Sequence, residues 1–229
     1  MLVEKVNDPR ICVSMTTPNF ADCYGIAQSC AMAELRLDLM QLKPEQVKQL
    51  LEHKELQTVA TCRASKLDTS ERLRQLQFAI RHGASYVDVE MESDESYRTA
   101  LVKFAEEHGC KIIISYHNFE QTPCLPEMRK IIADCRRMNA DIVKLVTTAR
   151  SAHDSARVMS LYEGESNLVA FAMGNAGKIT RIACLYLGAP FTYAAPACGL
   201  EAAPGQISAR SMNFMIQQFE NSTTQNPKT

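Results

Sequence analysis

Short apolar runs alternate with longer segments of helical period along most of the chain. Each run is rich in β-branched or aromatic residues and is short enough to form one buried strand. The runs lie at residues 11–15, 33–38, 58–63, 85–90, 111–117, 141–146 and 168–173, with a less regular one at 191–195. The pattern therefore predicts eight strands.

The segments between the runs place apolar residues three and four positions apart, which is typical of amphipathic helices. This spacing predicts helices at residues 44–52, 70–82, 93–108, 125–138, 151–163, 178–187 and 205–219. Pro44 stands at a first-turn position, and Ser70 is a candidate N-cap. Gly83 and Gly109 follow two of the helices, where glycine commonly ends a helix.

Strand–helix units repeated in this way predict parallel strands joined by right-handed crossovers. Eight units within 229 residues fit a single-domain (β/α)8 TIM barrel, an α/β fold of about 250 residues. We expect residues 1–220 to form this domain and residues 221–229 to form a polar, disordered tail. A doubly wound open sheet is the alternative, although the chain lacks the Gly-x-Gly-x-x-Gly turn of its dinucleotide-binding form.

Composition narrows the classes of partner. A formal net charge of −1 argues against nucleic acid and against an anionic membrane surface. No apolar run approaches the roughly 20 residues of a membrane helix, and residues 1–10 do not resemble a signal peptide. The nine cysteines are scattered without a Cys-x-x-Cys pair, which favours a reducing cytoplasm. We therefore expect a cytoplasmic protein without nucleic-acid or membrane partners.

Charged residues interrupt several predicted strands, although strands covered by helices should be almost continuously apolar. Facing the helices, these side chains would be buried without water. Facing inward at the carboxyl ends of barrel strands, they would line a site, because barrel enzymes keep their chemistry there. The set consists of Glu34, Arg36, Asp38, Arg63, Asp88, Glu90, Glu92, His117 and Lys144.

The carboxylates of this set have two further interpretations. Their role could be limited to that of counter-ions for Arg36 and Arg63, because ion networks are often structural. The acidic residues Asp88, Glu90 and Glu92 also share one face of a strand and form a candidate site for a hard metal. The nearby arginines oppose a bound cation, so we expect no metal.

Lys144 and His117 are the candidate catalytic residues. Lys144 is flanked by Ile142 and Val143 on one side and by further apolar residues on the other. A lysine in such a run is rare unless it is paired or functional. Apolar burial and neighbouring cations favour the neutral amine, which is the form that attacks a carbonyl. His117 ends the preceding strand and is a candidate general base. The alternatives are a lysine that extends to the rim and a structural histidine.

Two residues in later loops are candidates for binding. Arg181 follows the loop after the seventh run, and an arginine there could bind a substrate carboxylate with two hydrogen bonds. A solvated helix arginine is the alternative. Gln206 lies in the loop after the eighth run, where it would contact substrate or only cap the last helix.

Together these residues resemble the type I 3-dehydroquinate dehydratase family, the Schiff-base enzymes of the shikimate pathway. The resemblance covers nearly the full chain, and its motifs occur in order at barrel spacing. They are Glu34-Leu-Arg36-Leu-Asp38, Arg63, Asp88-Val-Glu90, Ser115-Tyr-His117-Asn-Phe119, Lys144, Met173-Gly174 with Arg181, and Ala203-Pro-Gly-Gln-Ile-Ser208.

The resemblance implies a mechanism for this third step of the pathway. Lys144 would form an imine with the C3 ketone of 3-dehydroquinate. His117 would remove the C2 proton and return a proton to the departing C1 hydroxyl, in a syn elimination that yields 3-dehydroshikimate and water. The imine serves as the electron sink, so no cofactor is expected.

The resemblance also implies how a carboxylated polyol is bound, and it implies a homodimer. Ring hydroxyls would contact Glu34 and Arg36, and nearby ring oxygens would contact Arg63. The substrate carboxylate would contact Arg181, and Gln206 would lie in a loop that closes over the substrate. The remaining implied residues are Ser14 as a substrate contact, with Asp88, Glu90 and Met173 in supporting positions.

The chain departs from the family pattern at three positions. Leu67 stands where the family often has a glutamate that can support the histidine, so Asp68 or another carboxylate would have to substitute. Ala202 replaces a common serine and loses one hydroxyl contact in the closing loop. Phe171 replaces a frequent methionine, an apolar exchange expected to change little.

Two other functions remain open from the residues alone. The first is another imine-forming barrel, such as a class I aldolase. The second is a catalytically silent barrel used for binding or regulation. The presence of both Lys144 and His117 argues against the silent barrel.

Overall fold

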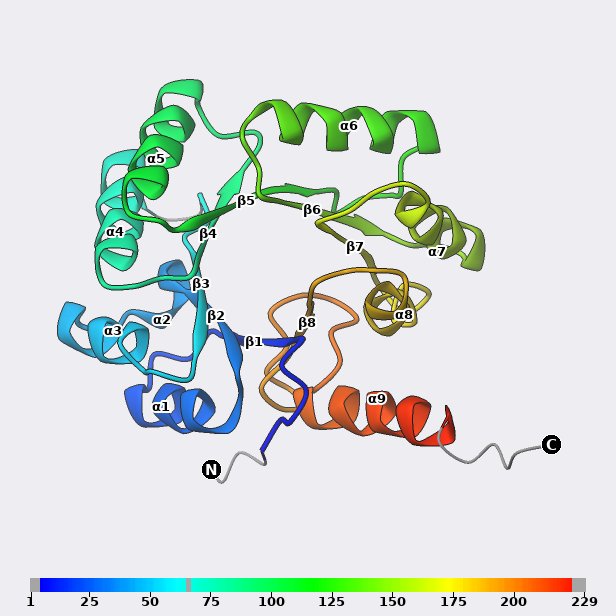
Figure 1. Ribbon diagram of the computed structural model, residues 1–229, viewed down its shortest axis with the longest axis horizontal. Coiled ribbons are helices and arrows are strands. Elements are labelled where there is room, and N and C mark those ends of the chain that lie inside the picture. Colours follow the sequence, from blue (N-terminus) through cyan, green and yellow to red (C-terminus); the bar gives the residue numbers. More distant parts are fainter. Residues whose placement is uncertain (1–4, 65–66, 224–229) are drawn as a thin grey trace.

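Eight parallel strands form a nearly closed barrel (Figure 1). The structure, a computed structural model, describes residues 5–64 and 67–223. The strands are β1 (Ile11–Met15), β2 (Met32–Arg36), β3 (Gln57–Thr61), β4 (Tyr86–Glu90), β5 (Lys111–His117), β6 (Ile142–Thr148), β7 (Leu168–Met173) and β8 (Thr192–Ala194).

The order of the strands confirms the predicted (β/α)8 barrel. Hydrogen-bonded neighbours follow the sequence from β7 back to β1, and β8 then pairs with β1. The order never reverses, as it would in a doubly wound sheet. Only β7 and β8 lack a neighbour on one side among the described strands, which leaves the barrel just short of closure.

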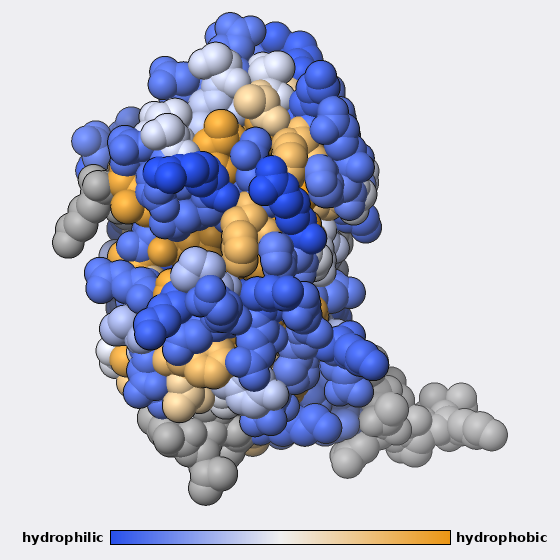
Figure 2. Space-filling view, turned by 90° about the vertical axis from the view of Figure 1, so that its left-hand side faces the viewer, coloured by the Kyte–Doolittle hydropathy of each residue, from blue (hydrophilic) through white to orange (hydrophobic). Residues whose placement is uncertain are grey.

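Helices surround the barrel and cover its outer face (Figure 1). They are α1 (Phe20–Ser29), α2 (Leu37–Met40), α3 (Pro44–Leu51), α4 (Thr69–Arg81), α5 (Glu95–Glu107), α6 (Leu125–Arg137), α7 (Ala152–Met159), the 3-10 turn η1 (Ser160–Tyr162), α8 (Thr180–Tyr186) and α9 (Ala209–Thr223). Figure 2 shows a side of the molecule on which hydrophilic residues dominate and apolar residues appear between them. Among the described residues, no helix combines the length and apolarity needed to cross a membrane.

Alternation along the strands divides the apolar core into two clusters. Val87 and Val89 of β4 belong to a large cluster that the strands share with the helices. Residues of the opposite parity, such as Val59 and Ile113, form a smaller cluster that also contains Phe171 and Tyr193. Because successive side chains of a strand point to opposite faces, this second cluster is the filling of the barrel interior. The polar site residues of the strands share its parity.

Two helices and several element ends differ from the sequence prediction. The helix α1 was not predicted, because Gly25 interrupts its apolar pattern and glycine disfavours helix. Asp38 lies in the single turn α2 and not in the second strand, which ends at Arg36. Asp68 caps α4 by accepting the N–H of Glu71, so the predicted cap at Ser70 is wrong.

Most of the remaining predicted boundaries are close to those observed, but α9 spans Ala209–Thr223 and not residues 205–219. Pro44 begins α3, and Gly83 and Gly109 have positive φ angles of 97° and 68° after α4 and α5. The strand β8 is shorter than predicted. The helix α9 reaches Thr223, and the rest of the predicted polar tail, residues 224–229, lies outside the described residues.

Gly177 allows the chain to turn tightly between β7 and α8. A Cβ at this residue would lie 2.4 Å from the carbonyl oxygen of Ala172, whereas a Cβ at Gly25 would meet nothing within 4 Å. We expect Gly177→Ala to lower the free energy of unfolding by about 1–3 kcal/mol, because backbone must move. The control Gly25→Ala, in a helix, should raise it by about 0.5–1 kcal/mol. Chemical denaturation measures both, and equal effects would contradict this account.

Candidate active site

A cavity of about 340 Å³ opens at the carboxyl ends of the barrel strands. Most residues that the sequence placed in the site line this cavity, whereas Asp38, Asp88 and Glu92 do not. Asp88 is still part of the site, because it contacts Lys144. The lining residues include Ser14, Glu34, Arg36, Arg63, Glu90, His117, Lys144, Met173, Arg181 and Gln206. The cavity wall also contains Phe119, Phe171, Tyr193 and Ala202.

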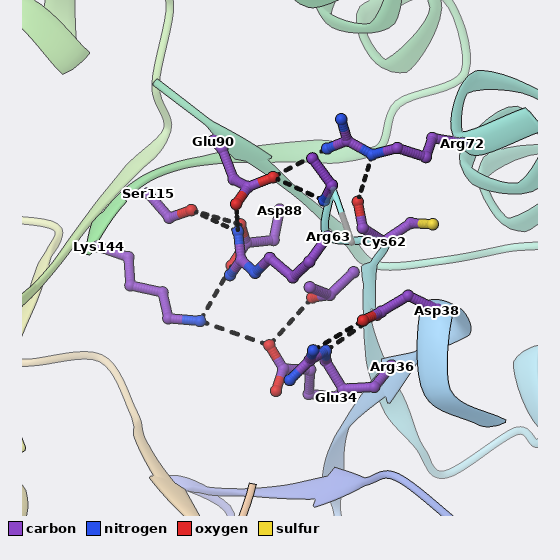
Figure 3. Close-up of polar contacts among 12 residues, drawn as sticks. Glu34, Arg36, Asp38, Cys62, Arg63, Arg72, Asp88, Glu90, Ser115 and Lys144 are labelled. Atoms are coloured by element: carbon purple, nitrogen blue, oxygen red, sulfur yellow. Dashed lines mark hydrogen bonds and ion pairs between the residues drawn. The ribbon is translucent and has the colours of Figure 1, made fainter. Parts of the chain in front are cut away.

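Lys144 projects from the middle of β6 into the cavity and is 4% exposed. Its Nζ atom lies 3.0 Å from Oδ2 of Asp88 and 3.4 Å from Oε1 of Glu34 (Figure 3). These carboxylates come from β4 and β2, whose interior parity they share. A buried lysine is thus held by two buried acids, as an interior ammonium requires.

Asp88 connects Lys144 to Arg63 and Ser115. Its two carboxylate oxygens accept hydrogen bonds from Arg63 Nη2 at 2.9 Å and Ser115 Oγ at 2.6 Å, and Arg63 Nη1 lies 2.8 Å from Oδ1. Burial alone would raise the pKa of the Asp88 carboxyl, but the positive charges of Arg63 and Lys144 hold it well below its usual range. Asp88 therefore carries a full negative charge under the cavity.

His117 is the last residue of β5 and faces the same cavity as Lys144. Burial, and then the positive charges of Arg63 and Lys144, lower the pKa of His117 well below its ordinary value. The imidazole is therefore neutral at pH 7 and able to accept a proton. Its ring stacks on that of Phe119, with centroids 6.0 Å apart.

Glu34 and Gln206 connect opposite parts of the site. Glu34 accepts hydrogen bonds from Ser14 Oγ at 3.1 Å and from Thr61 Oγ1 at 3.0 Å. The Gln206 amide donates to the same Ser14 hydroxyl at 3.2 Å, and its oxygen accepts the Ala202 N–H at 2.7 Å. The loop after β8 is therefore attached to β1 through Gln206.

Arg181 differs from the other cations of the cavity because it forms no ion pair with a carboxylate of the described residues. It is 1% exposed, and its Nε and Nη2 atoms have no hydrogen-bond partner among the described residues. Its guanidinium lies 4.4 Å from the ring centroid of Phe171, and burial lowers the pKa of Arg181 to about 10. An unpaired, buried guanidinium that faces a cavity is well suited to bind an anionic ligand.

Residues 11–223 match the family model for type I 3-dehydroquinase. The chain belongs to the type I 3-dehydroquinase family. A 3-dehydroquinate dehydratase of Dehalococcoides mccartyi is 32% identical over 212 residues, which cover 89% of this chain and 93% of the relative. A 3-dehydroquinate dehydratase of Thermococcus onnurineus is 40% identical over 147 residues, which cover 64% of this chain and 66% of the relative.

A solved member of the type I 3-dehydroquinase family shares the fold. The crystal structure of the Clostridium difficile enzyme with covalently modified comenic acid has a TM-score of 0.82 to this structure, at 20% identity. The match covers 96% of this chain and 98% of that chain. Because the chain is a type I 3-dehydroquinase, it is an enzyme, and the silent-barrel and aldolase interpretations are set aside.

Leu67 stands at the position where the family resemblance led us to expect a glutamate, and Asp68 does not replace it. Leu67 packs against the apolar core, while the Asp68 carboxylate accepts hydrogen bonds from Ser70 and Glu71 at the start of α4. The carboxylate that acts electrostatically on His117 is Asp88. Glu92 lies beyond the end of β4 and does not line the cavity, so it does not join the predicted acidic face.

Arg72 is a site residue that sequence reasoning missed. It is buried on α4, donates to the carbonyl of Cys62 at 3.0 Å and binds Glu90 at 2.9 Å (Figure 3). Cys62 directly precedes Arg63, and Glu90 Oε1 lies 3.8 Å from the Arg63 guanidinium. Arg72 thus fixes the backbone segment that carries Arg63. A charged position on an amphipathic helix carries no signal of burial, and this is why it was missed.

Arg36 contacts its neighbour Asp38 in an arrangement the sequence did not predict. The Arg36 guanidinium donates to both oxygens of Asp38, at 3.0 and 2.8 Å. Since Asp38 belongs to α2, the turn after β2 directs this cation over the cavity.

Arg181 should reduce the stability of the unliganded enzyme. Replacing an uncompensated buried charge by an apolar side chain removes its desolvation cost, so we expect Arg181→Met to raise the midpoint of thermal unfolding. Each kcal/mol corresponds to about 2–4 °C in a domain of this size. Arg129→Met, at an exposed position of α6, is the control and should leave the midpoint unchanged. Scanning calorimetry decides, and a lower midpoint for Arg181→Met would refute the account.

Proposed function

We propose that this enzyme dehydrates 3-dehydroquinate to 3-dehydroshikimate and water by syn elimination through an imine on Lys144. The observation that carries the proposal is the shared cavity of Lys144, His117 and Arg181. A primary amine, a neutral base and an unpaired cation suit a substrate that has a ketone, an acidic C–H bond and a carboxylate.

The first step forms the covalent intermediate. The ammonium of Lys144 passes one proton to the C3 oxygen of the substrate, and the Nζ atom freed in this way attacks C3. A second proton from the same nitrogen converts the C3 oxygen into water, which leaves, and a protonated C=N bond replaces the C=O bond. Protonated at nitrogen, this imine withdraws electrons from C2. The negative charge of Asp88, 3.0 Å from Nζ, stabilises the positive charge on that nitrogen.

The second step is the elimination. His117 removes the C2 proton, and the electron pair of that bond enters an enamine that includes the imine nitrogen. The pair then returns to form the C1–C2 double bond, as the C1–O bond breaks and His117 gives its proton to the departing hydroxyl. Water finally hydrolyses the imine and releases Lys144. All electrons move within the substrate and its imine, so no cofactor takes part in this scheme.

The remaining cavity residues bind the substrate in this proposal. Arg181 takes the carboxylate, because its donors have no other partner among the described residues. Met173 and Phe171 form an apolar part of the cavity wall, which Arg181 also lines. The ring oxygens are assigned to Ser14, Glu34, Arg36, Arg63 and Gln206, with Asp88 and Glu90 supporting them from below.

The cellular setting follows from the same proposal. As a dehydratase of 3-dehydroquinate, the enzyme would catalyse the third step of the shikimate pathway. We further propose that it acts in the cytoplasm as a homodimer on this small carboxylated polyol. Gel filtration with light scattering tests the dimer, since a monomer mass would exclude it.

Reductive trapping tests the proposed intermediate. With 3-dehydroquinate and borohydride, we expect a stable ligand adduct on Lys144 that mass spectrometry locates, and Lys144→Ala should abolish both adduct and turnover. The control Lys130→Ala, on the exposed surface of α6, should retain both. His117→Ala should still form the adduct while turnover falls at least ~10²-fold, as for loss of a general base. Turnover by Lys144→Ala without an adduct would exclude the imine.

The pH dependence tests the assignment of His117. Because its pKa is depressed below the ordinary value of 6.5, His117 remains unprotonated until the pH falls well below that value. The acid limb of kcat/KM, which reports the free enzyme, should therefore lie below pH 6.5. NMR titration of the histidine ring provides the matching pKa, and a value at or above 6.5 would contradict the assignment.

A further inference from the structure

The ring of Tyr193 lies against the nitrogen that forms the proposed imine. Tyr193 projects from β8 into the barrel, lines the cavity and is 3% exposed. The Nζ atom of Lys144 lies 4.0 Å from the centroid of the Tyr193 ring. This distance is well within the range of about 6 Å over which an aromatic face attracts a cation.

Neighbouring rings hold Tyr193 in this position. Phe191 lies 5.7 Å away in a T-shaped arrangement, and Phe171 lies 6.1 Å away at a tilt. The phenol oxygen is buried without a hydrogen-bond partner among the described residues, and burial raises its pKa well above the ordinary value. The group is therefore a neutral ring, and its contact with Lys144 is made by the face and not by the hydroxyl.

Imine formation changes which contacts the nitrogen is able to keep. An ammonium group has three N–H donors, enough for Asp88 and Glu34 together, whereas a protonated imine has one. The two carboxylates are also fixed by other partners: Arg63 and Ser115 bind Asp88, and two hydroxyls bind Glu34. At least one carboxylate therefore loses its hydrogen bond to the nitrogen when the imine forms. Attraction to a ring face needs no N–H and persists.

We propose that Tyr193 is a catalytic residue whose ring face stabilises the positive charge of the protonated Lys144 imine. This inference rests on the imine of the proposed function and adds a second source of stabilisation for it. The ring and the cation both lie in the barrel interior, away from water, and cation–π contacts are strongest in such an environment. Loss of the interaction should lower the population of the protonated imine and slow the elimination that depends on it.

A fluorinated series separates the ring's electrons from its shape. Phenylalanine and its mono-, di- and trifluorinated forms are placed at residue 193 by nonsense suppression, with Tyr193→Phe as the parent. Fluorine withdraws electron density from the ring face with little change in size. We expect kcat to fall progressively, by about 10-fold across the series. The pH above which cyanoborohydride no longer traps the adduct should fall in parallel, because the imine becomes easier to deprotonate.

Phe191 provides the matched control. It is equally buried, at 3% exposure, and it contacts Tyr193 without lining the cavity. The same series at residue 191 should leave kcat and the trapping pH unchanged. A flat series at residue 193, with the adduct still formed, would overturn the role of Tyr193 and leave the proposed function intact. Absence of any adduct from the unmodified enzyme would overturn the imine itself, and this inference with it.

Discussion

The charge of Asp88 is the constraint on which the arrangement of the site depends. A carboxylate that is 2% exposed inside a barrel is stable only if positive charge and hydrogen bonds balance it. Arg63, Ser115 and Lys144 supply that balance from three other parts of the barrel wall. The positions of the cations are therefore fixed before any ligand binds, and their charges add to the effect of burial in lowering the pKa of His117. Removing Asp88 would leave Lys144 with Glu34 alone and Arg63 with the more distant Glu90.

Two of the cations that line the cavity, Lys144 and Arg181, have different surroundings. Carboxylates balance the charge of Lys144, whose Nζ atom also lies over the ring of Tyr193. Arg181 contacts the ring of Phe171 and pairs with no acid in the part of the chain that the structure describes. The two rings belong to one aromatic group at the open seam between β7 and β8. Charge compensation thus remains incomplete on the side where an anionic ligand could complete it.

The sequence predicted the fold and most of the cavity residues for a simple reason. A charged residue is an exception in a buried parallel strand. Lys144 within an apolar run and His117 at the end of one could therefore be recognised as candidate site residues. Asp38 was misplaced because one turn of helix after β2 continues the alternation of a strand. Arg72 lies on a helix, where charged residues are common. Tyr193 is an aromatic residue in a strand, which is the usual place for one. Their roles depend on contacts between distant segments, which no local pattern encodes.

The parity of the interior side chains limits how the length of this chain can vary. Asp88 and Lys144 each face the interior because an even spacing separates them from the apolar residues below. One residue inserted into β4 or β6 would turn the charge toward the helices and bring an apolar residue into the cavity. The connections at the amino ends of the strands carry no such restriction, since they lie at the opposite end of the barrel. Insertions and deletions among related chains are therefore expected in those connections and not in the strands.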